Sequence, residues 1–212
     1  MFEKMLFLNF EEGNLKPEYW RRVDKITKQK FLLKADSPEV KIHLDADCLL
    51  LKHGMVADRA RIDSMPKLKY IGVLATAFGR IDTAYAKKRN ITVCNVPGYA
   101  TEGVVELVFA VLLEHLRKIA AAKLQAKQGN YSETAFMGTE IKGKLFGILG
   151  LGRIGNRVAQ IASLGFGAHV AYWSHKRKTD AEKHGCVRYM DANKVIATSQ
   201  ILSLHMGYNP QT

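Results

Sequence analysis

Residues 143–155, GKLFGILGLGRIG, contain an apolar run that breaks at Gly150 and continues through Gly152 and Gly155. Glycines at this spacing permit a tight turn, a close approach of the backbone to a pyrophosphate, and close packing of a helix on a strand. We therefore expect a strand over 145–149 and a helix over 153–164. The free N–H groups and the positive dipole end of that helix would form an anion site at the glycines.

The glycine spacing alone is a weak signal, because glycine clusters also occur in ordinary loops. The neighbouring sequence strengthens it, since a second apolar run, residues 168–173, follows the expected helix and completes a strand–helix–strand unit. This order predicts dinucleotide binding by the turn itself. The predicted cofactor-binding residues of the turn are Gly150, Leu151, Gly152, Arg153, Ile154 and Gly155.

The first 98 residues alternate apolar runs with amphipathic segments, as the strands and helices of a doubly wound parallel sheet do. The Pro97-Gly98 pair marks a boundary, so we expect one α/β domain over 1–98 and a second over 99–212. The expected strands of the first domain are 4–10, 31–33, 47–51, 68–74 and 91–95. Its expected helices cover 17–30 and 81–90, with shorter ones beginning at Pro38 and near Arg59.

A long helix is expected over residues 101–127, with Thr101 as its N-cap. Its apolar residues are too many for a single stripe, which indicates burial on several sides, between domains or against a second subunit. The side expected to be filled consists of Val104, Val108, Val111 and Leu112. A polar loop over 128–142 then leads to the phosphate-binding strand.

Composition narrows the functional class. The net charge of +12 would suit a nucleic-acid partner, but the basic residues are scattered and aromatic RNA-binding motifs are absent, so we expect no nucleic-acid partner. The three cysteines lack a CxxC spacing, which argues against a metal site or a disulfide. No apolar stretch reaches the roughly 18 residues of a membrane span, and the N-terminus lacks a secretory pattern. We expect a cytoplasmic protein without a membrane partner.

Three stretches together resemble the D-isomer-specific 2-hydroxyacid dehydrogenases: residues 95–102 (NVPGYATE), the glycine-rich turn, and Ser203-Leu204-His205. The resemblance implies a flavodoxin-like substrate domain followed by a Rossmann cofactor domain. It also implies hydride transfer between NAD(P)H and a small 2-oxo or 2-hydroxy acid, and a homodimer in which the helix from Thr101 takes part.

Site residues can be carried over where the positions match. Thr76 and Ala77 match the loop whose backbone N–H groups hold the substrate carboxylate in that family, and Thr101 and His205 match positions beside the cofactor. Lys52, at the end of an apolar strand, could face the same cleft and offer a cation to an acid substrate, as could His53. A solvated loop explains Lys52 and His53 equally well.

The resemblance also has departures. The family's catalytic histidine, its orienting acid and its carboxylate-binding arginine lie in segments after the strand that ends at His205, so no catalytic residue is expected within this chain. A Rossmann domain needs two βαβαβ halves, and we expect only the first half in this chain. We therefore expect residues 1–212 alone to show no dehydrogenase turnover. The alternative function is a dinucleotide-binding interaction protein of corepressor type, without catalysis.

The cofactor prediction depends on the end of the second strand, where NAD enzymes place an acid about 20 residues past the glycines. Here the position 19 after Gly155 is Ser174, followed by His175, Lys176, Arg177 and Lys178. A hydroxyl and cations suit a 2′-phosphate better than a carboxylate would, so NADP is expected over NAD. A solvated turn would also explain the basic run.

Overall fold

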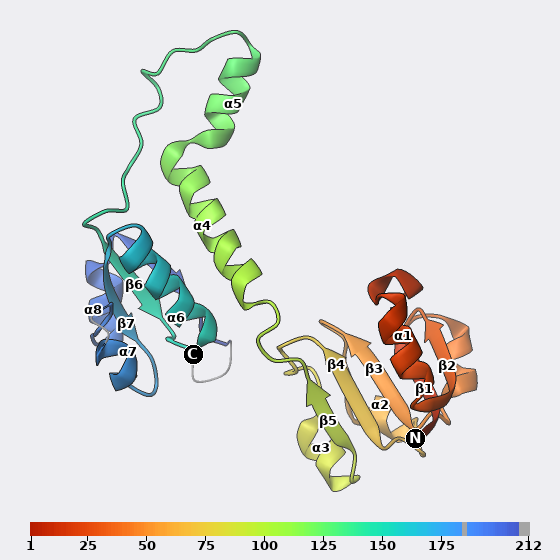
Figure 1. Ribbon diagram of the computed structural model, residues 1–212. Helices are drawn as coiled ribbons and strands as arrows, with labels where there is room; N and C mark the ends of the chain where they lie inside the picture. Colours follow the sequence, from red (N-terminus) through yellow and green to blue (C-terminus); the bar gives the residue numbers. More distant parts are fainter. Residues whose placement is uncertain (184–185, 208–212) are drawn as a thin grey trace. The chain divides into compact units, whose positions relative to one another are not determined.

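The computed structural model describes residues 1–183 and 186–207. The chain divides into two compact units, Met1–Tyr99 and Ala100–Thr212, each with its own hydrophobic core (Figure 1). Both units are built on a parallel sheet with helices packed against it, the α/β class expected from the sequence.

The first unit holds five parallel strands in the order β2-β1-β3-β4-β5, the flavodoxin-like arrangement. The strands are β1 (Phe2–Leu8), β2 (Thr27–Leu33), β3 (Cys48–Lys52), β4 (Tyr70–Leu74) and β5 (Thr92–Asn95). The connecting helices are α1 (Pro17–Asp24), α2 (Arg59–Asp63) and α3 (Thr83–Lys88), with 3-10 turns at Glu12–Asn14 and Pro38–His43.

The central strand β1 explains why this sheet is covered on both faces. Its residues alternate between two cores: Leu6 and Leu8 pack into one, and Met5 and Phe7 pack into the other beside Trp20 of α1. Because successive side chains of a strand point to opposite faces, a continuous apolar run is what a strand buried on both faces requires.

The boundary between α1 and β2 differs from the expectation. The helix expected over 17–30 ends at Asp24, and β2 begins at Thr27 instead of residue 31. Because β2 is an edge strand, Lys28 and Lys30 are tolerated in it; Lys28 pairs with Glu3 at 2.9 Å and Lys30 with Asp24 at 2.5 Å. The polar residues that suggested a longer helix are therefore the exposed side of a strand.

The second unit holds four parallel strands in the order β8-β7-β6-β9. The strands are β6 (Leu145–Leu149), β7 (His169–Trp173), β8 (Arg188–Tyr189) and β9 (Ile201–Leu204). The helices after the glycines are α6 (Arg153–Gln160), continued by a π-helical turn at Ile161–Gly165, then α7 (Thr179–Lys183) and α8 (Ala192–Thr198).

This strand order reproduces positions 3-2-1-4 of a Rossmann sheet. The strand β9 lies on the opposite side of β6 from β7, and it belongs to the second half of that fold. The described unit thus extends one strand past the first half. The order reverses beside β6, which makes the carboxyl end of β6 the topological switch point where ligands bind in such sheets.

The helix expected over 101–127 is two helices, α4 (Thr101–Arg117) and α5 (Ile119–Lys127). They are separated by Lys118, whose φ of 52° is left-handed. The returning loop stabilises this break, because Lys118 Nζ donates to the Ala135 carbonyl at 3.1 Å and the Thr139 N–H donates to the Leu116 carbonyl at 3.1 Å. Thr101 is the first helical residue and not the N-cap, which is Ala100.

The buried face of α4 is also different from the expected one. Helix α4 packs along α6 through Val105 and Phe109, with Val108 and Leu112 at the margin of the core (Figure 1). Val104 and Val111, expected on the filled side, are exposed within this unit. Together with Leu107 they form an exposed apolar face, in which Leu107 and Val111 are 62% and 61% exposed.

Candidate dinucleotide-binding site

Gly150 directly follows β6 and has a conformation that favours glycine. Its φ is 98°, and an added Cβ would lie 2.8 Å from the backbone carbon and oxygen of His205, at the end of β9. The Gly150 N–H donates to the Trp173 carbonyl at 2.7 Å, which ties the turn to β7 as well. The turn is therefore fixed between the ends of three strands.

The other two glycines have different surroundings. A Cβ on Gly155 would lie 2.2 Å from the Gly150 carbonyl oxygen, so this glycine allows α6 to pack close to the turn. Around Gly152 an added Cβ would meet nothing within 4 Å. No internal contact requires a glycine at 152, and its open face is the part of the turn that a ligand can approach.

The start of α6 presents unpaired donors beside this open face. The first N–H that bonds into the helix is that of Asn156, which donates to the Gly152 carbonyl at 2.9 Å. Within the described ranges, the N–H groups of Gly152, Arg153 and Ile154 have no acceptor. Free N–H groups at a helix N-terminus bind phosphate, so the turn fits a pyrophosphate.

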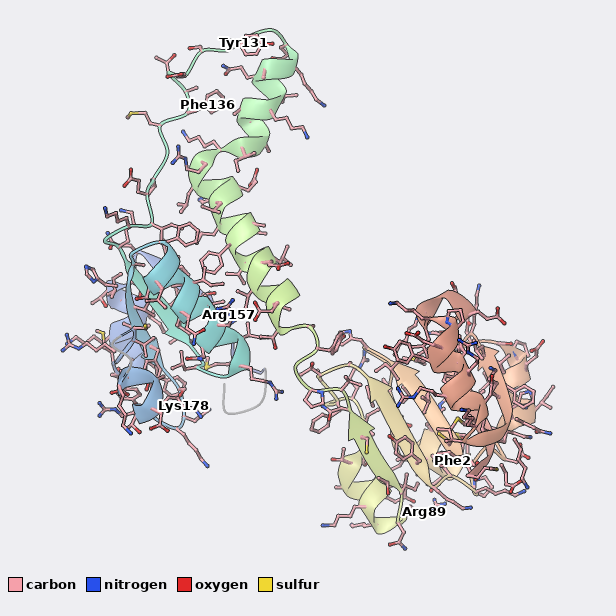
Figure 2. All side chains as sticks on the ribbon, viewed as in Figure 1. Phe2, Arg89, Tyr131, Phe136, Arg157 and Lys178 are labelled. Carbon is pink, nitrogen blue, oxygen red and sulfur yellow. The ribbon has the colours of Figure 1, made fainter. Side chains whose placement is uncertain are left out.

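A cleft of about 900 Å³ extends from this turn to the segment after β7. Gly152 and Arg153 line one end, and Arg177 and Lys178 line the other; Figure 2 shows Lys178 on the segment between β7 and α7. The remaining lining residues are Leu151, Asn156, Gln160, Leu164, Thr179, Asp180, Ala181, Cys186 and Val187. The cleft is large enough for the adenosine half of a dinucleotide.

The basic segment after β7 is partly organised by its own contacts. Ser174 Oγ donates to the Lys176 carbonyl at 2.6 Å, and the His175 ring lies 5.1 Å from the Trp173 ring. His175 and Lys176 are exposed, and neither they nor Ser174 line the cleft. Of the basic run after Ser174, Arg177 and Lys178 line the cleft.

Arg177 belongs to a network that the sequence analysis did not find. Its Nε and Nη2 donate to the Glu182 carboxylate at 2.9 and 2.7 Å, and the Tyr172 hydroxyl donates to the same carboxylate at 2.7 Å. These bonds hold the pKa of Glu182 down to about 2, with Arg177 as the larger cause, while burial raises the pKa of Tyr172 to about 12. The sequence did offer one signal for this network: Tyr172 lies inside an apolar strand, and a buried tyrosine hydroxyl needs a hydrogen-bond partner.

His205 lies beside the glycine turn. Its N–H donates to the Leu149 carbonyl at 2.8 Å, and its Nε2 is 2.9 Å from Ser203 Oγ. Partial burial lowers the pKa of the imidazole, which favours its neutral form. Thr101, the other residue expected near the cofactor, begins α4 directly after Ala100.

In the first unit, Thr76 and Ala77 follow β4 on an exposed loop that β5 braces. Thr76 Oγ1 donates to the Val96 carbonyl at 3.2 Å, and Asn95 Nδ2 donates to the Thr76 carbonyl at 2.7 Å. The N–H groups of Thr76 and Ala77 have no acceptor among residues 1–183 and 186–207. The loop therefore presents two free amide donors on a fixed backbone.

Lys52 is the last residue of β3, paired in register with Leu74 of β4. Its Nζ lies 5.5 Å from the centre of the Phe10 ring, an arrangement that suits a cation without a carboxylate partner. Because parallel strands end at the same edge, Lys52 and the Thr76 loop share the carboxyl edge of this sheet.

In the described part of the chain, none of the histidines forms an ion pair or a hydrogen bond with a carboxylate. None of the His, Cys, Asp and Glu residues of that part cluster as a metal site. In the same part, no helix combines the length and hydropathy that a membrane crossing needs.

A parallel sheet of Rossmann order, with a glycine turn and free helix donors at its switch point, defines a dinucleotide-binding protein. Residues 109–212 match the family model for the D-isomer specific 2-hydroxyacid dehydrogenase, NAD binding domain. The chain belongs to this family of D-isomer-specific 2-hydroxyacid dehydrogenases.

Two curated relatives are glyoxylate reductases. That of Thermococcus litoralis is 35% identical over 162 residues, which cover 73% of this chain and 49% of the relative. That of Aeropyrum pernix is 32% identical over 178 residues, which cover 79% and 52%. The chain thus spans about half the length of the curated relatives it matches.

Solved structures agree in fold. A D-lactate dehydrogenase from Aquifex aeolicus, complexed with NAD and lactic acid, has a TM-score of 0.86 and 26% identity, covering 98% of this chain and 62% of that one. An acyclic imino acid reductase in complex with NADPH and D-Arg has a TM-score of 0.84 and 26% identity, covering 99% and 67%. Both are bound to a nicotinamide dinucleotide.

Proposed function

We propose that this chain provides the cofactor-binding and substrate-binding parts of an NAD(P)-dependent oxidoreductase acting on a small 2-oxo or 2-hydroxy acid. The observation that carries the proposal is the turn at Gly152, where free N–H groups at the start of α6 open onto the 900 Å³ cleft. Glyoxylate reductases among the relatives support the substrate class.

The residues have separate tasks in this proposal. The N–H groups of Gly152, Arg153 and Ile154 hold the pyrophosphate, and His205 lies beside the turn, where its neutral ring can contact the cofactor without adding charge. When bound, the cofactor supplies or accepts the hydride. Thr101 is assigned beside it from the family resemblance alone.

The substrate side rests on the first unit. The free N–H groups of Thr76 and Ala77 donate to the substrate carboxylate, in the way that paired backbone donors stabilise an anion. Lys52 adds a positive charge at the same sheet edge. Domain roles follow as a proposal: 1–98 for the substrate and 99–212 for the cofactor.

NADP is proposed as the preferred cofactor. Ser174 stands where NAD enzymes have an acid, and Arg177 lines the cleft, with His175 and Lys176 between them in the sequence. Isothermal titration calorimetry of the full chain with NADPH and NADH tests this preference. Tighter NADH binding would refute it.

A homodimer is proposed through the exposed apolar face of α4 formed by Val104, Leu107 and Val111. Light scattering coupled to size exclusion should report a dimer at micromolar concentration, and Leu107→Glu should shift it to a monomer. A monomeric wild-type chain would contradict the proposal. A cytoplasmic location and the absence of nucleic-acid and membrane partners remain predictions from the sequence.

Binding and catalysis are separated by one further assay. With NADPH and glyoxylate, the polypeptide of residues 1–212 should bind the dinucleotide but show no turnover, because its described residues include no histidine paired with a carboxylate. Turnover near one per second, a typical enzyme rate, would show that other residues supply the proton donor. Binding of dinucleotide without substrate affinity would favour the alternative, a dinucleotide-responsive interaction protein.

A further inference from the structure

The guanidinium of Arg177 is held more firmly than its position on an exposed segment requires. Its Nε donates to both Glu182 oxygens, at 2.9 and 3.2 Å, and its Nη2 donates to one of them at 2.7 Å. The ring of Tyr189 lies 5.2 Å from the guanidinium carbon. The plane of the guanidinium is therefore fixed both at one edge and on one face.

Glu182 is fixed in turn from inside the domain. The Tyr172 hydroxyl donates to Glu182 at 2.7 Å and accepts the Lys178 N–H at 2.7 Å, while the Tyr172 ring is completely buried and meets the Tyr189 ring edge-on at 5.5 Å. Only 19% of the Glu182 side chain is exposed, against 59% for Arg177. The low pKa of Glu182, about 2, keeps its carboxylate ionised at neutral pH.

This arrangement leaves one edge of the guanidinium for a ligand. Arginine has five N–H donors in a planar fork, and Glu182 uses the edge formed by Nε and Nη2. In the described part of the chain, Nη1 has no acceptor. The end edge of the fork, Nη1 with the second Nη2 proton, is the geometry that binds a phosphate through two bonds.

We infer that Glu182 is a positioning residue for a 2′-phosphate subsite: braced by Tyr172, it holds Arg177 at the wall of the cleft so that its end edge receives the phosphate. This inference rests on the proposed function, and it assigns a role to an acid that would otherwise be expected to repel a phosphate. Because Glu182 already holds the Arg177 guanidinium in place, the side chain loses less rotamer entropy when the phosphate binds than a free arginine would.

A positioning role for Glu182 and simple charge repulsion by Glu182 have opposite effects on NADPH binding. If Glu182 acts only through its negative charge, its removal should tighten NADPH binding. If it positions Arg177, Glu182→Gln should weaken NADPH binding about three- to tenfold and leave NADH binding unchanged. Asp180→Asn is the matched control, because Asp180 lines the same cleft but pairs with Lys183, at 2.9 Å, and not with Arg177. The control should bind NADPH at least as tightly as the wild type.

The test is calorimetric titration of the full chain and its variants with NADPH and NADH, alongside thermal unfolding without nucleotide. Arg177→Gln should lose about tenfold or more in NADPH affinity. Arg177→Lys keeps the charge but not the two-bond contact with Glu182, and it changes an exposed side chain, so it tests the inference even if Glu182→Gln folds poorly. It too should weaken NADPH binding without affecting NADH.

The outcomes separate this inference from the function on which it rests. A wild-type chain that prefers NADPH, with Glu182→Gln or Arg177→Lys binding it as tightly, overturns the positioning role alone. Tighter NADPH binding by both Glu182→Gln and Asp180→Asn overturns it in favour of charge repulsion. A wild-type chain that binds neither dinucleotide refutes the proposed function, and this inference with it.

Discussion

Replacing Gly155 and Gly152 by alanine, one at a time, should separate the folding role of the glycine turn from its binding role. At Gly155 the new Cβ would lie 2.2 Å from the Gly150 carbonyl oxygen, 0.8 Å inside the 3.0 Å that real Cβ atoms keep. The obstacle is backbone, so α6 itself has to move away from the turn. Gly152→Ala meets nothing within 4 Å, and Gly152 has a φ of −83°, which alanine adopts freely.

The magnitudes follow from these contacts. Alanine in a helix gains up to about 1 kcal/mol over glycine, but overpacking of this kind costs about 1–3 kcal/mol and more where backbone must shift. We expect Gly155→Ala to lose about 2 kcal/mol net, which lowers Tm by about 8 °C for a unit of this size. Gly152→Ala should stay within about 1 kcal/mol of the wild type, since it loses only a slightly better N-cap.

For dinucleotide binding we expect a large effect of Gly152→Ala, the variant that changes stability least. The Cβ of Gly152→Ala projects into the space assigned to the pyrophosphate, so NADPH affinity should fall at least about tenfold while Tm stays within about 4 °C of the wild type. Calorimetry of unfolding and NADPH titration measure the two effects. A Gly155→Ala variant that melts with the wild type, or a Gly152→Ala variant that binds NADPH as tightly as the wild type does, would refute these roles of the two glycines.

Three further predictions concern individual side chains. Val105→Ala, at a fully buried position of α4, should cost about 2 kcal/mol in urea unfolding; an effect below about 0.5 kcal/mol would mean that α4 does not pack as described. Burial raises the pKa of the Cys48 thiol to about 12, so iodoacetamide at pH 8 should label exposed Cys94 but not Cys48 until denaturant is added, as mass spectrometry would show. Burial lowers the pKa of His205 below its usual 6.5. As pH falls below 6.5, the unfolded chain therefore takes up this proton before the folded chain does, and the free energy of unfolding declines until the pH passes the folded pKa. His205→Gln should reduce that decline between pH 7.5 and 5, and an identical decline in both proteins would contradict the assignment.

The pairing of Arg177 with Glu182 shows why the sequence can locate a binding segment but cannot identify all of the residues that position it. The basic segment after β7 was identified from its distance to the glycines, which is a local count along the chain. That Arg177 spends one edge on Glu182, and that Tyr172 braces the pair, depends on α7 folding back over the end of β7. Side chains five and ten residues apart meet here because of a turn whose direction no spacing rule fixes.

The helix after Thr101 gives a second example. Its apolar residues predicted a long helix with a broad buried surface, yet Lys118 interrupts it and Val105 and Phe109 are the buried positions. Helix propensity cannot reveal the interruption, because Lys118 is a good helix former and its left-handed conformation is stabilised by contacts with the loop near Ala135 and Thr139.

The sequence by itself determined the parts of this protein that local sterics control. An apolar run of strand length that ends at Gly150 and is followed by Gly155 requires strand, tight turn and helix in that order. Only a residue without a Cβ fits the turn at Gly150 and the close packing at Gly155. The tertiary structure alone decided which strands became neighbours. Placing β9 beside β6 brings His205 to the glycine turn 55 residues away in sequence, since strand pairing is set by the packing of the whole sheet and not by any one segment.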